Sequence, residues 1–374
     1  SMRTPEKPGE EVWGGRRAVF YSDDARLWLE RSAAAGYTAP TWPREYGGAG
    51  LDAADAAVLA EELRAAGCRM ALRSLGLWML GPVLLAHGTE EQKRVHLRAI
   101  ASGAARWCQG YSEPGAGSDL SSLQTRAVRD GDHYVVDGHK VWTSHGHLAD
   151  WMFCLVRTGC FDVGARKRDG ISFLLIDMAS PGISVRPIEL ISGSSVFCET
   201  RFEGVRVPVA NRIGPENGGW RLALELLQHE RTVISVMRDA VPEESEPLEA
   251  LALRLLGRSP DRALADSRVR DRVAAAGIDF LANRLTIRRV REDPASSAVG
   301  MIGKLVGTEL SQRRKELRIE LAGYQALGWD GPGYSADELQ GTRDWLRSRA
   351  STIEGGTSEI QLNTIAKRVL GLPD

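Results

Sequence analysis

Hydrophobic and polar positions divide the chain into three stretches of different periodicity. Between residues 22 and 103, apolar residues recur at helical spacing, and Thr89-Glu90-Glu91-Gln92 has the pattern of a capping box at the start of a helix. Between residues 106 and 215, short apolar and β-branched runs are separated by turn residues, which is typical of strands. Helical periodicity returns from residue 220. This order predicts an α+β fold instead of alternating βαβ units.

The boundaries of these stretches give three expected domains. They are an N-terminal helical domain (1–105), a central β domain (106–215) and a C-terminal helical bundle (216–374). A β-hairpin, three further strands and four C-terminal helices are predicted. The strands are 128–136, folded back at a short turn, 151–156, 171–176 and 183–188, and the helices are 220–237, 262–291, 298–323 and 358–370.

Composition and charge exclude several classes of protein. The chain has 374 residues, with 48 Lys and Arg against 49 Asp and Glu, so nothing suggests attraction to nucleic acid or to an anionic membrane. The longest apolar run, 75–86, is too short and too broken to span a bilayer. The five scattered cysteines predict reduced thiols in a cytoplasmic protein, and from the polar first residues we expect no secretion signal. No Rossmann or P-loop glycine motif is present.

Two segments of the β region could face a cofactor. Residues 107–119 run from a strand into a turn of small residues, which leaves backbone N–H groups open to a diphosphate; an ordinary tight turn is the alternative. Residues 138–147 place Trp142 beside hydroxyl groups at a strand end, where it could flank a planar cofactor, although a half-buried strand Trp is commoner. His145 and His147 lack neighbouring ligand residues, so no metal is expected.

Two segments of the C-terminal region carry further chemistry. Glu230 lies in the middle of the apolar stripe of helix 220–237, where desolvation would make its carboxylate a stronger base; a Glu paired with a core Arg is the alternative. Gly355 and Gly356 precede a predicted capping box formed by Ser358 and Gln361. Free N–H groups at such a helix start bind anions or polarise a carbonyl, but a simple capped helix uses the same atoms.

Taken together, these segments resemble the acyl-CoA dehydrogenase family, particularly its actinobacterial members. The matching motifs follow the family's order over nearly the whole chain. They are Trp42-Pro43 with Tyr46-Gly47-Gly48, residues 88–93, Ser112-Glu113-Pro114-Gly115-Ala116-Gly117-Ser118-Asp119, residues 138–144, Ser180-Pro181-Gly182, Val205-Arg206-Val207-Pro208, Glu230-Arg231 and residues 355–361. The resemblance implies a helical domain, a β domain and a four-helix bundle. It also implies bound FAD and a homodimer or homotetramer, with a heterotetramer as a further possibility.

The resemblance also assigns roles to single residues. The positions that match flavin contacts are Gln109, Tyr111, Ser112, Gly117, Ser118, Trp142, Ser144, Gly356, Thr357 and Glu359. Arg270 is a looser match to an arginine that reaches the FAD of a neighbouring subunit.

The implied reaction is α,β-dehydrogenation of an acyl-CoA thioester, with electrons passed on to an electron-transfer flavoprotein. The backbone N–H of Gly355 is expected to hold the enolate oxygen. The family places its base on the helix that carries Glu230 or directly before the terminal Gly-Thr pair, where this chain has Gly355 and Glu354 stands one residue early. Glu230 is therefore the expected base and Glu354 the alternative. A non-catalytic, flavin-supporting subunit and an acyl-CoA oxidase are the competing functions, and the acyl chain cannot be read from the sequence.

Overall fold

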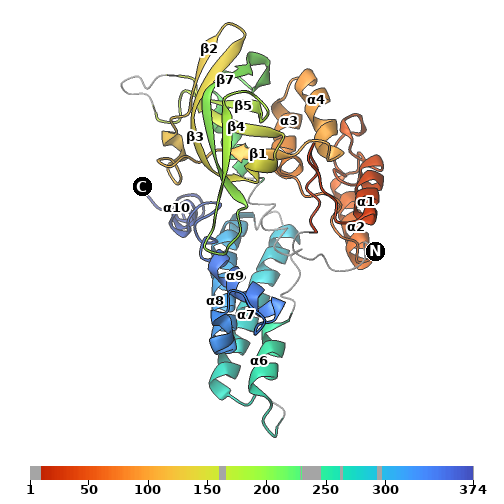
Figure 1. Cartoon of the computed structure of the whole chain (residues 1–374), viewed down its shortest axis with the longest axis vertical. Coiled ribbons are helices and arrows are strands. Elements are labelled where there is room, and N and C mark those ends of the chain that lie inside the picture. Colours follow the sequence, from red (N-terminus) through yellow and green to blue (C-terminus); the bar gives the residue numbers. More distant parts are fainter. Residues whose placement is uncertain are drawn as a thin grey trace. The chain divides into compact units, whose positions relative to one another are not determined.

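The chain forms two compact units. The computed structural model describes residues 10–159, 166–227, 229, 246–261, 264–292 and 297–373 (Figure 1). Unit 1 comprises residues up to 188 together with 195–230, and unit 2 comprises residues 189–194 together with those from 231 onward. Each unit is described by itself below.

Unit 1 begins with helices whose ends follow from local sequence. Ser22 and Asp52 cap the first two helices through their side-chain oxygens, and Thr89 with Gln92 forms the predicted capping box. The helices are α1 (Asp23–Ala34), α2 (Ala53–Ala65), α3 (Gly81–His87) and α4 (Glu90–Ala101). The apolar run before α3 is a π-helix, η2 (Gly76–Leu80). Such π-turns are rare and occur often at functional sites.

The rest of unit 1 is a mixed sheet followed by the start of a helix. Its strands are β1 (Trp107–Gly110), β2 (Arg126–Asp130), β3 (His133–Ser144), β4 (Trp151–Arg157), β5 (Ile171–Asp177), β6 (Ile183–Ile188), β7 (Phe197–Pro208) and β8 (Arg212–Ile213). The strand order is β6-β7-β3-β2-β4-β5-β8, and β1 pairs with β4 in parallel. The predicted hairpin between β2 and β3 is confirmed. Residues 219–227 are helical, and the remainder of the predicted helix 220–237 lies largely outside the described residues.

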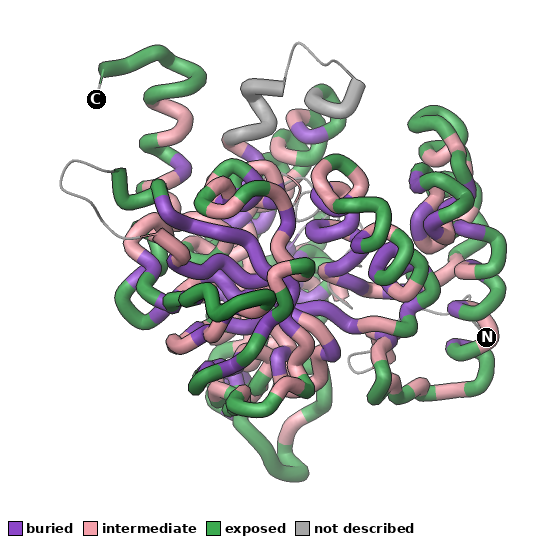
Figure 2. Tube along the Cα trace, turned by 90° about the horizontal axis from the view of Figure 1, so that it is seen from above, coloured by how far each residue is buried: buried purple, intermediate pink, exposed green. Residues whose placement is uncertain are grey.

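Strand β4 separates the two hydrophobic cores of unit 1. Phe153 and Leu155 pack with the N-terminal helices and with Phe173, while Met152 and Cys154 belong to the core on the opposite face. Such alternation follows from the two-residue period of a strand. Burying each large apolar side chain contributes about 1.5–3 kcal/mol. The buried backbone is drawn purple in Figure 2.

Unit 2 is built from helices. They are α6 (Leu248–Leu256), α7 (Ser267–Glu292), α8 (Ser297–Ala322), the short η7 (Gly323–Leu327), α9 (Ala336–Ser348) and α10 (Ser358–Arg368). A small core of Leu248, Ala252, Val273 and Leu317 joins α6, α7 and α8. The predicted order of helices, sheet and helices is thus confirmed. None of the helices in the described ranges combines the length and apolar character needed to cross a bilayer.

Candidate functional site

The turn after β1 presents exposed backbone, as the sequence predicts. Residues Glu113 and Ala116 close it through two backbone hydrogen bonds of 3.1 and 3.0 Å. Gly117 and Ser118 are exposed, and a Cβ added to Gly115 or Gly117 would meet no atom within 4 Å. The turn therefore leaves room for a ligand against its main chain. We call residues 111–119 the first turn.

A buried ion pair anchors the first turn. Lys140 of β3 is fully buried, and its Nζ donates to Glu113 Oε1 at 2.8 Å and to the Tyr111 carbonyl at 3.0 Å. The Glu113 carboxylate also accepts the backbone N–H groups of Gln124 (2.7 Å) and Thr125 (2.9 Å). Burial alone would raise the pKa of Glu113, but Lys140 and these donors hold it below its usual value. The buried Glu113 carboxylate remains ionised because it and the Lys140 ammonium group both have hydrogen-bond partners.

Strand pairing brings the two predicted cofactor segments of the β region together. The Val141 N–H donates to the Ser112 carbonyl at 2.9 Å, so the first turn lies against β3. Tyr111 is buried with its ring edge-on to Phe153 and Phe173, and Gln109 lies in β1 opposite Phe153 of β4. Segments some thirty residues apart thus form one continuous surface.

Trp142 has a left-handed backbone conformation that is rare for a bulky residue. Its φ of 61° is left-handed, a conformation that costs a bulky side chain free energy and is concentrated at active sites and ligand clamps. It lies where the β3–β7 register shifts between Lys140 and Thr143, and 53% of its surface is exposed. Ser144, at the end of β3, pairs with Phe197, whose ring meets the Trp142 ring edge-on at 6.1 Å. The indole of Trp142 therefore offers an exposed flat face on β3, the strand against which the first turn lies.

The two histidines of this segment have different partners. The His145 ring lies 4.7 Å from the Trp13 ring, and burial together with nearby Arg106 lowers the pKa of His145 to about 4. His147 Nδ1 lies 3.1 Å from the Cys198 thiol. Both rings therefore take part in packing within unit 1.

In unit 2, two left-handed glycines precede α10. Gly355 and Gly356 have φ values of 65° and 93°. The N-cap of α10 is Thr357, whose side chain accepts from the Ile360 N–H at 3.2 Å. The predicted cap at Ser358 is therefore one residue late: Ser358 is the first residue inside the helix, because the chain leaves the left-handed region only after Gly356. We call residues 355–357 the second turn.

The second turn is held on its carbonyl side. The Gly355 carbonyl accepts from Gln361 Nε2 at 3.2 Å, and the Gly356 carbonyl accepts from Lys304 Nζ at 2.5 Å. In the described part of the chain, the N–H groups of residues 355–357 have no hydrogen-bond partner. Glu359 follows in the first turn of α10, where its own backbone N–H and the Thr357 hydroxyl lower the pKa of its carboxyl. The turn thus leaves three backbone donors available.

The remaining predicted residues have contrasting surroundings. Glu354 forms an ion pair with Arg347 at 2.7 Å, and 42% of its side chain is exposed. Arg270 is exposed on α7. Glu230 lies outside the described residues. The helix that leads to it buries Leu222, Ala223 and Leu226.

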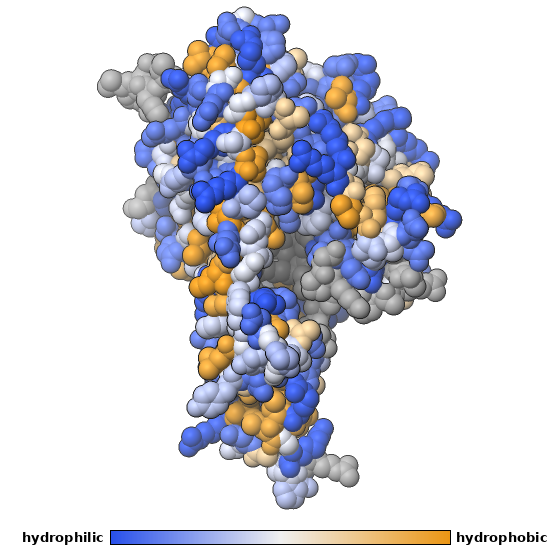
Figure 3. Space-filling view, in the orientation of Figure 1, coloured by the Kyte–Doolittle hydropathy of each residue, from blue (hydrophilic) through white to orange (hydrophobic). Residues whose placement is uncertain are grey.

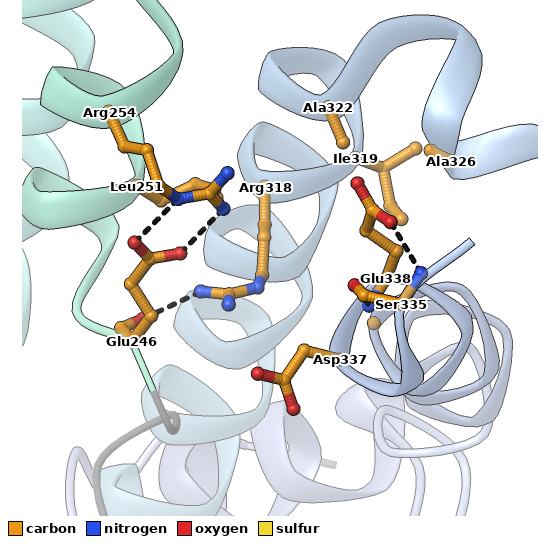
Figure 4. A pocket seen from close by; sticks show the side chains of 11 residues that line it. Glu246, Leu251, Arg254, Arg318, Ile319, Ala322, Ala326, Ser335, Asp337 and Glu338 are labelled. Atoms are coloured by element: carbon orange, nitrogen blue, oxygen red, sulfur yellow. Dashed lines mark hydrogen bonds and ion pairs between the residues drawn. The ribbon is translucent and has the colours of Figure 1, made fainter. Parts of the chain in front are cut away.

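Two cavities in the described part of unit 2 contain none of the predicted site residues. One, of about 460 Å³, lies between α6, α8 and α9 (Figure 4). Arg254 and the Glu246 carboxylate in its wall neutralise each other through hydrogen bonds of 2.8 and 2.9 Å. Arg318 donates to the Glu246 carbonyl at 2.7 Å. The other, of about 420 Å³, lies beside residues 192–194, and Arg347, the partner of Glu354, lines it.

Sequence comparison decides the family. Profiles of the acyl-CoA dehydrogenase N-terminal, middle and C-terminal domains match residues 7–104, 108–205 and 217–370. The chain belongs to the acyl-CoA dehydrogenase family. It is therefore a flavoprotein oxidoreductase of lipid metabolism, as the resemblance of its motifs predicts, and FAD is its cofactor.

Curated relatives and solved structures agree with this assignment. Acyl-CoA dehydrogenase IpdE1 of Mycobacterium tuberculosis is 39% identical over 94% of this chain and 89% of its own length. IpdE1 of Mycolicibacterium smegmatis is 34% identical over the same shares. The structure of the "Tcur3481-Tcur3483 steroid ACAD" has a TM-score of 0.76 at 31% identity, covering 94% of this chain and 90% of its own. The ChsE4–ChsE5 complex of Mycobacterium tuberculosis has a TM-score of 0.73 at 31% identity, covering 94% and 93%.

The described residues suit a flavin. A dinucleotide needs open backbone donors for its diphosphate and a flat contact for its ring. Within unit 1, the first turn and the exposed Trp142 provide such features, and within unit 2 the N–H groups of the second turn provide open donors.

Several residues with a supporting role were not predicted as site residues. Lys140 and Lys304 are both buried with their ammonium groups on the backbone of a predicted flavin segment, and Lys304 lies within the apolar run 301–307. A lone lysine inside an apolar run is the signal that could have identified Lys304, because lysine is rarely buried without a partner.

Proposed function

We propose that the chain catalyses the FAD-dependent α,β-dehydrogenation of an acyl-CoA thioester, with Glu230 as the base that removes the α-proton. The observation that carries this proposal is the second turn, where left-handed glycines leave backbone donors without partners in the described chain. An enolate oxygen requires such preorganised donors. When bound, FAD supplies the acceptor for the β-hydride.

The chain's own residues would have three roles: binding the cofactor, stabilising the thioester oxygen and accepting the α-proton. The first turn and Trp142 bind and orient the cofactor, and the Gly355 N–H holds the thioester oxygen as negative charge develops on it. Glu230 holds the abstracted proton. An electron-transfer flavoprotein is the proposed acceptor of the electrons, as the family implies.

Two observations support Glu230 over Glu354. Residues 223 and 226 of the helix leading to it are fully buried, and position 230 continues their spacing of three to four residues. A carboxylate on that face would be desolvated and more basic. Glu354 is partly exposed and forms an ion pair with Arg347, so this ion pair would have to break before Glu354 could accept a proton.

The names of the relatives suggest a substrate class. A structural relative at 31% identity is described as a steroid acyl-CoA dehydrogenase, so we propose an acyl-CoA thioester that carries a steroid or a similarly bulky ring system. Fatty, branched and biosynthetic acyl groups are the alternatives to be tested beside it.

An assembly with a second chain is proposed as well. Figure 3 shows hydrophobic patches on the surface of the bundle. On α7, Ile278, Leu281 and Leu285 share one face and are 68%, 54% and 55% exposed. The structural relatives named as two-chain complexes favour a heteromer as the alternative to a homodimer or homotetramer.

An anaerobic titration tests the proposed function. The purified chain is expected to be yellow, and its flavin absorbance should bleach with a steroid acyl-CoA and less with short-chain thioesters. A yellow chain that no thioester bleaches would overturn the proposal. A colourless chain that gains FAD only with a partner chain would indicate the flavin-supporting subunit, and peroxide formation without another acceptor would indicate an oxidase.

A further inference from the structure

Two nearly inaccessible side chains contact the carbonyl oxygens of the second turn. Lys304 of α8 is 7% exposed, and Gln361 of α10 is 3% exposed. Lys304 Nζ donates to the Gly356 carbonyl and Gln361 Nε2 to the Gly355 carbonyl, at 2.5 and 3.2 Å. Consecutive carbonyls of one turn are therefore held from two different helices.

Fixing these carbonyls fixes the N–H groups of the same peptide units. In a trans peptide, the C=O and N–H bonds point in opposite directions. The peptide that carries the Gly355 carbonyl also carries the Gly356 N–H, and the next one carries the Thr357 N–H. Both N–H groups therefore point away from Gln361 and Lys304, and neither has a partner in the described chain.

The contacts also affect how well these groups donate. A hydrogen bond from an ammonium group is stronger than one between neutral groups, and it polarises the peptide it reaches. Burying a lysine costs free energy unless the ammonium group is well bonded. The bond to the Gly356 carbonyl therefore stabilises the buried ammonium group and polarises the peptide that carries the Thr357 N–H.

We propose that Lys304 and Gln361 are positioning residues: they clamp the second turn, which fixes the Gly356 and Thr357 N–H groups as donors and restrains, through the Gly355 Cα, the Gly355 N–H that would hold the enolate oxygen. The inference rests on the proposed function and deepens it. A rigid donor set stabilises the transition state more than the bound thioester. Loss of the clamp is therefore expected to lower kcat and leave KM nearly unchanged.

The test compares Lys304→Met with Lys304→Arg in the full-length flavoprotein. Lys367→Met, an exposed position in the last turn of α10, is the matched control. We expect Lys304→Met to lower kcat about 10- to 100-fold, the scale of losing one oxyanion donor or less, with KM changed less than about threefold. It should also shift the visible spectrum of bound FAD and raise the dissociation constant of FAD. Lys304→Arg should recover part of each.

Gln361→Met provides a second route, because it removes the other donor and keeps the length of the side chain. It is expected to change kcat and the flavin spectrum in the same direction as Lys304→Met and by less, and it keeps the test available if Lys304→Met does not fold. Wild-type kcat, spectrum and FAD affinity in either folded variant would overturn the clamp. If no thioester bleaches the wild-type protein, the proposed function fails by itself, and the spectra and FAD affinities of the variants still decide the clamp.

Discussion

The first turn and the second turn, each proposed to contact the flavin, are stabilised in different ways. In the first turn, a buried lysine and glutamate neutralise each other, and the glutamate binds two further N–H groups. In the second turn, Lys304 and Gln361 bind backbone carbonyls directly. The first arrangement locks a whole loop to a sheet, whereas the second fixes individual peptide groups. The difference suggests that the first turn provides a binding surface and the second an oriented set of donors.

The largest effect is expected at the buried ion pair. Lys140→Met leaves the Glu113 carboxylate buried without its cation, so we expect the free energy of unfolding to fall by about 3–5 kcal/mol. The matched control is Lys167→Met, which breaks the exposed pair with Asp119 of the same turn and should cost less than about 1 kcal/mol. Urea unfolding measures both. Equal costs for the two variants would contradict the role given to Lys140.

A smaller, pH-dependent change in stability is expected from His96 of α4, which packs against β1 and β4. His96 is buried edge-on against Trp107 and Trp151, and burial lowers its pKa from 6.5 to about 4. The unfolded chain therefore binds a proton that the folded chain does not, and stability falls as the pH drops from 6.5 toward 4. Between pH 7 and 5, the wild type should lose about 2 kcal/mol more than His96→Phe, by urea unfolding at each pH. Identical losses would mean that His96 is protonated in the folded state.

The smallest change in stability is expected from alanine substitution of a glycine, compared between Gly356 of unit 2 and Gly131 of unit 1. Gly356→Ala places a Cβ 2.6 Å from Gln361 Nε2 at a φ of 93°, whereas Gly131→Ala has a φ of 61° and no atom within 4 Å. Both changes strain the backbone, but only the first also displaces the clamp. We expect Gly356→Ala to cost about 1 kcal/mol more than Gly131→Ala and to raise the dissociation constant of FAD. Equal FAD affinity in both variants would show that Gly356 has no special role.

Much of the fold could be predicted because its signals are local. Thr89 and Gln92 mark the start of α4, and the strand runs at 151–156, 171–176 and 183–188 match β4, β5 and β6 within one residue at each end. The long β7 and the helices α6 and α9 were not predicted. Charged residues alternate with the buried ones in β7, a two-residue period that indicates a half-buried strand but that a search for uninterrupted apolar runs misses. Its long pairing with β3 is a tertiary interaction that a short window does not show.

The candidate site could be predicted only in part. Glycines and small residues mark the exposed sides of both turns, and a sequence shows them directly. The groups that hold the turns come from distant positions, since Lys304 reaches across 52 residues to Gly356 and Lys140 across 27 to Glu113. Such contacts depend on how helices and strands pack, and periodicity does not report that.

The most direct test of the account is the flavin's response to substrate in Glu230→Gln. Glu225→Gln, five residues earlier and paired with His87 at 2.8 Å, is the control. We expect both variants to fold and to bind FAD. Acyl-CoA should bleach the control under anaerobic conditions and leave Glu230→Gln yellow, because the α-proton has no acceptor. Bleaching of Glu230→Gln at the wild-type rate would contradict the assignment of Glu230 and direct the search for the base to Glu354.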